Sequence, residues 1–281
     1  ALILVDYPGF NLRIAEWAKK NNYKIFYYIS PQVWAWKSSR VNKIKRDVDK
    51  MLVILPFEKD FYLQWNYDVE FVGHPLLDAL KNYKAEDLRL KTNQPIIAIL
   101  PGSRKQEIAT MLPIMLQVVN DFPDHQFAIA GVNSIEKNFY LELIGNKNVD
   151  LVFDQTYSLL SVSQAALVTS GTATMETALF NVPQVVCYKG SLLSYFIARR
   201  LVDVKFIAMV NLVLDRPLVK ELIQQDLTAE NLKIELRNIL SNEEKRKEIS
   251  EGYKELREKL GGEGASTRAA KAILSNLNDA Q

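Results

Sequence analysis

Two short loops in the second half of the sequence place glycine, hydroxyl and charged residues directly after apolar runs. The first loop follows Ile96–Leu100 and contains Gly102, Ser103 and Arg104, with a helix expected to begin near Lys105. Beyond the carboxyl end of a parallel strand, free backbone N–H groups and a helix N-terminus attract anions. A glycine allows close backbone approach, and a guanidinium can give two parallel hydrogen bonds to a phosphate. The loop therefore fits either a phosphate-binding site or an ordinary strand–turn–helix joint.

A second loop of this kind follows the apolar run Ala166–Thr169 and leads into another helical pattern. Its small side chains would let the backbone crowd against a ligand, and its hydroxyls add donors. Glu176, one turn into the helix, could accept hydrogen bonds from a vicinal diol such as ribose. A well-capped buried helix is the alternative for this segment alone, but two such loops favour a nucleotide, with one loop on the diphosphate and the other on the sugar. The candidate residues here are Ser170, Gly171, Thr172, Ala173, Thr174 and Glu176.

Composition and motif spacing exclude several other kinds of chemistry. The sequence has neither the spacing of a Walker A loop nor a GxGxxG dinucleotide fingerprint. One cysteine and two histidines exclude a disulfide framework and a cysteine-built or three-histidine metal site, and fit a reducing, cytoplasmic setting. With 35 Lys and Arg against 33 Asp and Glu, the chain lacks the basic excess of a general nucleic-acid binder. It also has no apolar run of about 18 residues that could form a transmembrane helix.

The two loops belong to a chain in which short apolar runs alternate with helical patterns. This alternation predicts βαβ units and mainly parallel sheets, so the expected fold class is α/β. The runs are apolar almost throughout, which is typical of strands covered on both faces. The expected strands are Ala1–Val5, Lys24–Ile29, Met51–Leu55, Val69–Val72, Ile96–Leu100, Phe127–Ala130, Leu151–Phe153, Ala166–Thr169 and Val185–Tyr188.

The length of 281 residues suits roughly two domains of about 150 residues each. The polar stretch 82–94 has no core pattern and is expected to be a linker. It separates a first doubly wound, Rossmann-like domain, residues 1–81, from a second one, residues 95–240, and the two are expected to face a cleft. The tail, residues 241–281, contains only helical patterns and is expected to pack back on the first domain.

Together these motifs resemble the lipid-A-disaccharide synthase family, nucleotide-sugar glycosyltransferases with the two-domain GT-B fold. The segment PQVWAW and the combination of LPGSR with SGTATME are specific, although each alone would not be. The resemblance implies an inverting transfer from UDP-2,3-diacylglucosamine to 2,3-diacylglucosamine 1-phosphate, which gives lipid A disaccharide 1-phosphate and UDP. The matching segments run in family order across nearly the whole chain: 5–11, 29–40, 55–58, 72–78, 100–108, 169–179 and 210–224.

The resemblance places a UDP site in the second domain. Arg104, the loop 170–174 and Glu176 would serve diphosphate and ribose, and Glu107 would orient Arg104. Asn211 matches a polar position of the family at the cleft, with a loop-capping role as the equal alternative. No catalytic metal or other cofactor is expected, and Arg104 and the helix N-termini would stabilise the departing UDP in place of a metal.

An Asp-x-Asp triplet, Asp47–Asp49, is the pattern of metal-dependent glycosyltransferases. It precedes the expected strand Met51–Leu55 instead of following it, which puts it at the amino edge of the sheet, away from the ligand side. We interpret it as a solvated turn. His74 is interpreted as a packing or positioning residue.

A glycosyl transfer also needs a base for the attacking sugar hydroxyl. Asp6 ends the first expected strand, where a parallel sheet places ligands, and it is the candidate general base. The alternative is an aspartate that caps the next helix. Many family members carry a second acidic residue where this chain has Gly9, so that position is a competing location for the base in the family.

Acylated substrates imply an enzyme that is cytoplasmic and peripheral on the inner face of the inner membrane. Aromatic residues beside Lys and Arg suit a surface of anionic headgroups. The alternative for both basic segments is a core-facing helix with a solvated basic face. Homo-oligomerisation is left open. The candidate membrane-facing residues are Trp34, Trp36, Lys37, Arg40, Arg199 and Arg200.

Three functions remain to be separated. Another GT-B UDP-sugar enzyme, such as a peptidoglycan glycosyltransferase or a UDP-sugar epimerase, would share the nucleotide site, and so would an inactive fragment that only binds nucleotide sugars. The chain starts in mid-strand at Ala1, whereas family members begin with further strands and helices. We therefore expect the 281 residues to hold a complete donor domain and only part of the acceptor domain and its active site.

Overall fold

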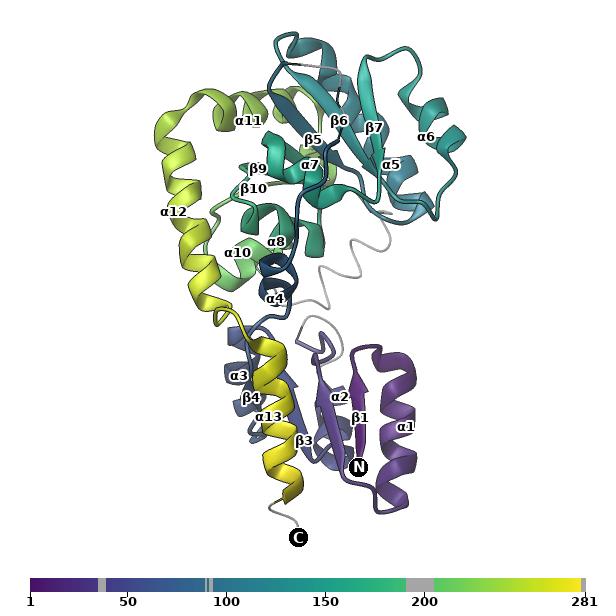
Figure 1. Cartoon of the computed structure of the whole chain (residues 1–281), viewed down its shortest axis with the longest axis vertical. Coiled ribbons are helices and arrows are strands. Elements are labelled where there is room, and N and C mark those ends of the chain that lie inside the picture. The colour runs from purple at the N-terminus through teal and green to yellow at the C-terminus, as the bar shows by residue number, and fades with distance from the viewer. Residues whose placement is uncertain (35–38, 89, 91–92, 191–204, 279–281) are drawn as a thin grey trace. The chain divides into compact units, whose positions relative to one another are not determined.

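The computed structural model describes residues 1–34, 39–88, 90, 93–190 and 205–278, and contains two separate parallel sheets (Figure 1). The chain divides into two compact units, each with one sheet. Within the described residues, the first unit comprises 1–83 and 257–278, and the second comprises 84–190 and 205–256. The expected α/β class with two Rossmann-like sheets is confirmed.

The first unit has a four-stranded sheet in the order β1-β2-β3-β4, with all neighbouring strands parallel. Helices follow the strands, as the alternating pattern predicts. The strands are β1 (Leu2–Val5), β2 (Ile25–Tyr28), β3 (Lys50–Val53) and β4 (Glu70–Phe71). The helices are α1 (Pro8–Lys20), α2 (Arg40–Asp47), α3 (Pro56–Leu63), α4 (Leu76–Lys81) and the C-terminal α13 (Ala265–Asn278).

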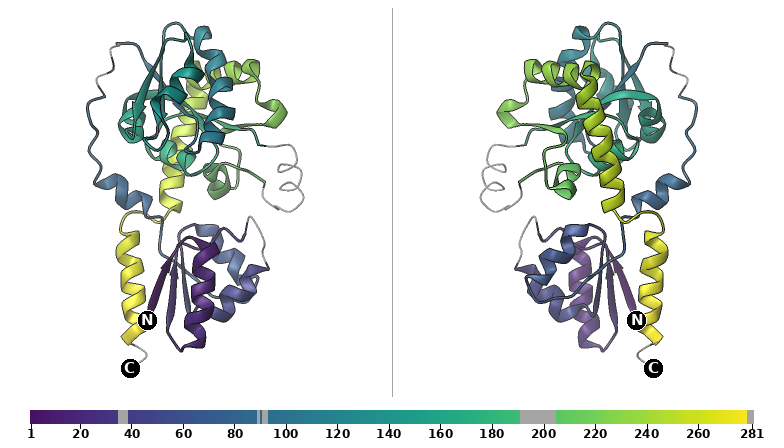
Figure 2. Two further views of the ribbon diagram at one scale, coloured as in Figure 1. Left: turned by 90° about the vertical axis from the view of Figure 1, so that its right-hand side faces the viewer. Right: turned by 90° about the vertical axis from the view of Figure 1, so that its left-hand side faces the viewer.

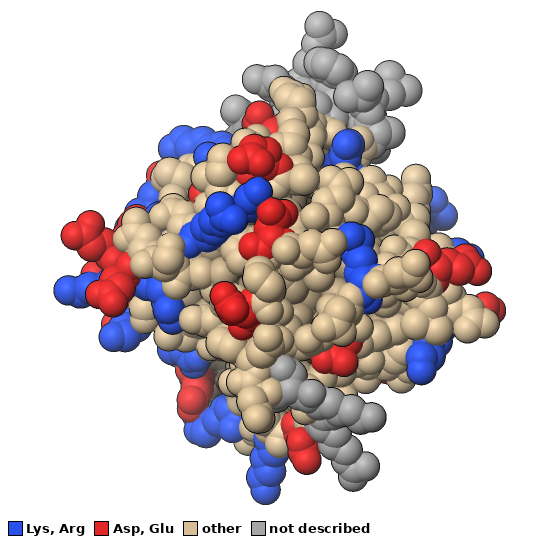
Figure 3. Space-filling model, turned by 90° about the horizontal axis from the view of Figure 1, so that it is seen from above, with Lys and Arg blue, Asp and Glu red and all other residues tan. Residues whose placement is uncertain are grey.

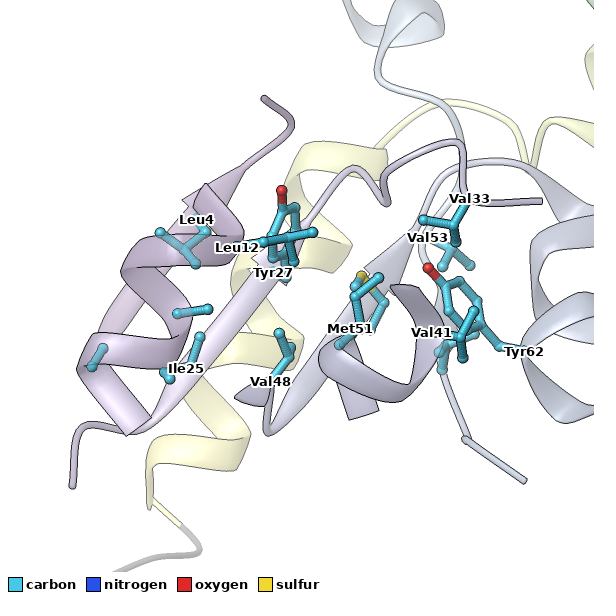
Figure 4. Packing of buried hydrophobic residues seen from close by; sticks show 14 residues of the cluster. Leu4, Leu12, Ile25, Tyr27, Val33, Val41, Val48, Met51, Val53 and Tyr62 are labelled. Atoms are coloured by element: carbon cyan, nitrogen blue, oxygen red, sulfur yellow. The ribbon is translucent and has the colours of Figure 1, made fainter. Parts of the chain in front are cut away.

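The central strands β2 and β3 are covered on both faces, which explains their almost continuously apolar sequences. Ile25 and Tyr27 point into a core shared with α1 and α2, together with Met51 of β3 (Figure 4). Side chains alternate along a strand, so Phe26 of β2 and Leu52 of β3 point to the other face of the sheet, where they pack against α13. Figure 2 shows α13 and α1 on opposite sides of the sheet.

The second unit has a six-stranded parallel sheet in the order β10-β9-β8-β5-β6-β7. Its strands are β5 (Ile96–Leu100), β6 (Gln126–Gly131), β7 (Val149–Phe153), β8 (Ser163–Thr169), β9 (Gln184–Tyr188) and β10 (Lys220–Ile223). The chain runs outward from β5 to β7 and then returns to place β8 on the other side of β5. Such a reversal of strand order is where open α/β sheets bind ligands, beyond the strand carboxyl ends.

Helices connect and cover these strands. They are α5 (Lys105–Met115) with the 3₁₀ turn η1 (Leu116–Asp121), α6 (Lys137–Ile144), α7 (Thr156–Val162), α8 (Thr172–Leu179), α10 (Met209–Leu214), the 3₁₀ turn η2 (Gln224–Asp226), α11 (Ala229–Ser241) and α12 (Glu243–Lys259). The tail consists of α12 and α13 (Ala265–Asn278), in agreement with the helical patterns of its sequence. Contacts assign α12 up to Leu256 to the second unit, and only the residues beyond it to the first.

The stretch expected to be a linker is partly docked on the second unit. The backbone N–H of Glu86 donates to the hydroxyl of Ser158 at 2.8 Å, and Gln155 donates to the Glu86 carboxylate at 3.0 Å. Leu88 and Leu90 pack against the core of that unit. Two isolated leucines among charged residues show no periodicity, so the sequence gives no sign of this docking.

The tail is fixed to the first unit through the segment 72–78. The Asp78 carboxylate accepts hydrogen bonds from the backbone N–H groups of Gly264 (2.5 Å) and Ser266 (2.9 Å), at the start of α13. These bonds hold the pKa of Asp78 below its usual value. Arg268 donates to the carbonyl of Val72 at 2.8 Å.

No described helix is both long and apolar enough to cross a membrane. On the face seen in Figure 3, basic and acidic side chains are intermingled.

Candidate functional site

A pocket of about 340 Å³ lies in the second unit, at the carboxyl ends of β5 and β8. These strands are neighbours, and Leu100 pairs with Val168, so the two sequence loops emerge side by side. From the predicted residues, the pocket is lined by Gly102, Ser103, Arg104, Glu107, Ser170, Gly171, Thr172, Ala173 and Glu176. Leu100, Ala130, Val132, Thr156 and Thr169 complete the lining.

The first loop presents a cation held by a neighbouring carboxylate. Arg104 donates to Oε1 of Glu107 at 2.8 Å, while the Arg104 side chain remains 81% exposed. Oε2 of Glu107 accepts from the backbone N–H of Ser103 at 3.4 Å. Gly102 has φ +110°, and a Cβ at this position would lie 2.9 Å from that same oxygen. Only glycine therefore fits this turn with the Glu107 carboxylate in place.

The second loop is shaped by a buried hydroxyl and a glycine. Thr174 is fully buried, and its hydroxyl donates to the carbonyl of Gly171 at 2.8 Å. The sequence nominated Thr174 as a ligand contact, but the structure places it beneath the loop and outside the pocket lining. Ser170 lines the pocket, and its hydroxyl donates to the carbonyl of Ile207 at 3.0 Å.

Glu176 combines a position in the pocket wall with a fixed hydrogen bond. The hydroxyl of Tyr157 donates to Oε1 of Glu176 at 2.7 Å. Tyr157 and Thr156 were not among the predicted residues. Both open the helix after β7, so the strand–loop–helix rule that found the other loops also applies to them. Their loop lacks glycine, and nothing local in the sequence pairs it with α8.

Asn211 is fully buried and does not line the pocket. It donates to the carbonyl of Val219 (2.9 Å) and to Glu221 (2.8 Å), and accepts from the N–H of Val219 (3.0 Å). Glu221 in turn accepts from the backbone N–H groups of Ile207 and Ala208. The loop-capping alternative therefore describes this side chain. Asn211, through Glu221, thus supports the segment that contains Ile207, whose carbonyl accepts the hydrogen bond from the Ser170 hydroxyl.

Asp6 lies in the first unit, directly after β1, in a left-handed backbone conformation with φ +46°. Tyr7, with φ +43°, follows in the same region, and two such residues in succession mark a strained segment of the type found at functional sites. The carbonyl of Asp6 accepts hydrogen bonds from Tyr27 (2.6 Å) and Asn11 (2.7 Å). Its carboxylate is exposed and has no partner among the residues that the structure describes, so it does not cap α1.

A buried carboxylic acid that the sequence did not single out lies near the carboxyl edge of the same sheet. Glu58 accepts hydrogen bonds from the N–H groups of Leu55 (2.9 Å) and Ile54 (3.2 Å), and from the indole of Trp34 (3.3 Å). Burial raises the pKa of Glu58 to about 7, although these bonds act in the opposite direction. Trp34 also packs edge-on against Phe57, so it is half-buried.

The Asp-x-Asp triplet differs from its interpretation as a solvated turn. Asp47 is 2% exposed and is paired with Arg46 at 2.6 Å. Asp49 accepts from the backbone N–H of Ile25 at 2.8 Å and pairs with Lys19. Asp49 thus links the amino end of β2 to α1, while Asp47 is buried at the end of α2 beside Arg46. His74 accepts from the N–H of Leu76 at 3.2 Å, and burial lowers its pKa to about 4.

Solved structures of the same architecture define the class of this chain. The UDP-N-acetylglucosamine 2-epimerase of Neisseria meningitidis, solved with UDP-GlcNAc, superposes with a TM-score of 0.67 at 15% identity, over 97% of this chain and 76% of that one. The calicheamicin glycosyltransferase CalG4 superposes with a TM-score of 0.58 at 15% identity, over 98% and 75%. The fold is therefore that of GT-B glycosyltransferases and epimerases.

Sequence relatives narrow the class to one family. The model of the lipid-A-disaccharide synthetase family matches residues 1–275. The lipid-A-disaccharide synthase of Syntrophus aciditrophicus is 43% identical over 98% of this chain and 75% of its own length. That of Trichlorobacter lovleyi is 38% identical, over 98% and 74%. The chain belongs to the lipid-A-disaccharide synthase family, and is thus related to glycosyltransferases of lipid A biosynthesis.

Proposed function

We propose that the pocket between the β5 and β8 loops binds the UDP portion of a UDP-diacylglucosamine donor. The observation that carries this proposal is the meeting of two ligand-type loops at the point where the strand order reverses. The exposed guanidinium of Arg104 and the backbone N–H groups around Gly102 and Gly171 suit a diphosphate. Glu176 suits the ribose diol.

The reaction proposed is the inverting transfer of 2,3-diacylglucosamine from UDP to 2,3-diacylglucosamine 1-phosphate. A hydroxyl of the acceptor sugar attacks the anomeric carbon of the donor, the bond from that carbon to the diphosphate oxygen breaks, and UDP leaves. Negative charge grows on the departing diphosphate, so a fixed cation and helix N-termini lower the barrier. Arg104 and the N-terminus of α8 supply them here, in place of a metal.

Asp6 is the proposed general base. Its carboxylate is exposed and unpaired within the described part of the chain, while hydrogen bonds to its carbonyl fix the backbone beneath it. A base with these properties can take the proton of the acceptor hydroxyl without first breaking another interaction.

The proposed location is the cytoplasmic face of the inner membrane, because both substrates carry acyl chains. Of the candidate membrane-facing residues, Arg40 is exposed at the start of α2, whereas Trp34 is held by Glu58 and Phe57. Trp36, Lys37, Arg199 and Arg200 lie outside the described residues. Within that set, Arg40 is the residue that we propose meets anionic headgroups.

Turnover with both acylated substrates tests the proposed function. Release of UDP that depends on donor and acceptor together is the expected result. A protein that binds UDP without this turnover would be a nucleotide-sugar binder, and one that interconverts UDP sugars without an acceptor would be an epimerase. Either outcome would contradict the proposal.

A further inference from the structure

The carboxylate that we assign to the ribose diol is held from outside the pocket by a tyrosine. Tyr157 belongs to α7 and Glu176 to α8. The residue before Tyr157, Thr156, lines the pocket together with Glu176, but Tyr157 is not part of that lining. Its hydroxyl reaches Oε1 of Glu176 at 2.7 Å, the usual length of an O–H···O⁻ bond.

The ring of Tyr157 is fixed by a second contact with the same helix. It packs against Phe180, with ring centroids 5.3 Å apart and planes tilted by 43°. Phe180 follows Glu176 by four positions, so both lie on one face of α8 and its C-terminal end. The tyrosine thus bridges α7 to α8 by its ring, which fixes where its hydroxyl can lie.

A glutamate carboxylate otherwise has a soft terminal torsion and samples a broad range of orientations. The bond from Tyr157 engages Oε1 of Glu176. The other oxygen, Oε2, has no hydrogen-bond partner in the described part of the chain. A carboxylate has about four acceptor sites on its two oxygens, so a ligand diol in the pocket would still meet enough free sites for both hydroxyls, on a group that is already oriented.

We propose that Tyr157 is a positioning residue that holds Glu176 ready for the vicinal diol of a ribonucleoside diphosphate, and so gives the pocket its preference for a ribose with both hydroxyls. This inference rests on the proposed UDP site. It adds that selection at the sugar depends on a side chain that does not touch the ligand. A hydrogen bond made by a pre-oriented group loses less conformational entropy on binding, which makes it stronger in net terms.

The test is calorimetric titration of the full chain with UDP and with 2′,3′-dideoxy-UDP. The wild type should bind UDP on the order of ten times more tightly, because the dideoxy nucleotide cannot donate hydrogen bonds to Glu176. In Tyr157→Phe, which keeps the ring against Phe180, UDP binding should weaken about fivefold, the usual effect of one hydrogen bond. Binding of the dideoxy nucleotide should stay within about twofold.

Two further variants complete the experiment. Glu176→Gln should lose most of the preference, and adding Tyr157→Phe to it should change the preference no further, since the two residues act as one unit. Tyr67→Phe removes a hydroxyl that donates to the Val48 carbonyl in the first unit, and should leave both affinities unchanged.

Each outcome is distinct. A wild type that binds neither nucleotide would contradict the proposed UDP site itself. A wild type that binds both equally would remove the contact between Glu176 and the diol. A preference that is the same in Tyr157→Phe as in the wild type would overturn the positioning role of Tyr157 and leave the UDP site standing.

Discussion

The segment after β1 and the loops after β5 and β8 occupy equivalent places, at the carboxyl ends of parallel strands, but they are built differently. In the second unit, the charged side chains at the pocket are paired with neighbours: Arg104 with Glu107, and Glu176 with Tyr157. In the first unit, the backbone of Asp6 is held while its carboxylate is left unpaired within the described residues. The contrast fits the roles that we propose, with nucleotide binding in the second unit and proton transfer in the first.

The largest effect is expected from Arg104→Ala. Removing the cation that we propose faces the departing diphosphate should reduce turnover by about 10⁴-fold, as for other arginines that stabilise phosphoryl charge. UDP affinity should fall as well, and Arg104→Lys should restore only part of both, because an ammonium lacks the bidentate fork. Steady-state kinetics and UDP titration give the two numbers. Normal turnover in Arg104→Ala would remove the phosphate assignment.

Asp6→Asn should distinguish the proposed role of the first unit, proton transfer, from that of the second unit, UDP binding. An asparagine cannot accept the proton, so kcat should fall by about 10³-fold, within the usual range for a general base. UDP affinity should stay at the wild-type value, because Asp6 is not part of the pocket lining. If the variant instead lost UDP affinity and kept kcat, the division between binding and proton transfer would be wrong.

Glu58 should give the first unit a pH-dependent stability. Its folded pKa of about 7 lies above the ordinary value of 4.5, so the folded state binds the proton more tightly than the unfolded state. This contribution is fully present below pH 4.5 and is lost as pH rises through 7, by roughly 3 kcal/mol in total. In Glu58→Gln, the free energy of unfolding should therefore fall less between these pH values. Urea denaturation at several pH values measures this change. An equal change of the free energy of unfolding with pH in the wild type and in Glu58→Gln would contradict the buried, protonated state of Glu58.

Gly102→Ala should harm the pocket through its backbone. A residue with a Cβ is strained at φ +110° and meets the Glu107 carboxylate, so we expect a loss of about 1–3 kcal/mol of stability. UDP affinity should fall about tenfold as Glu107 and Arg104 shift. The matched control is Gly145→Ala, at φ +58° with open space around its Cβ. It should lose stability and keep its UDP affinity.

The smallest effect is expected at Arg40, the residue that we propose meets anionic headgroups. Arg40→Ala should weaken sedimentation with anionic vesicles about fivefold, since one basic residue near the surface contributes about 1 kcal/mol. High salt should release the wild type. Lys137→Ala, an exposed cation of the second unit, is the control and should leave vesicle binding unchanged. A wild type that does not sediment at low salt would contradict the membrane proposal.

The sequence predicted what depends on local pattern. Apolar runs next to small and charged residues identified both pocket loops, because the carboxyl ends of parallel strands share one edge of a sheet. It missed what depends on strand order and packing. Tyr157 meets Glu176 only because α7 returns the chain from β7 to β8. Leu88 packs against the core of the second unit, but an isolated leucine gives no periodic signal in the sequence. Glu58 was missed because its burial arises from the fold and not from its neighbours in sequence.

A crystal structure of the chain with UDP tests the central claim most directly. We expect the diphosphate on Arg104 and on the backbone N–H groups of the loops after β5 and β8, and the ribose hydroxyls on Glu176. UDP bound elsewhere, or bound in the pocket with its diphosphate away from Arg104, would contradict the account.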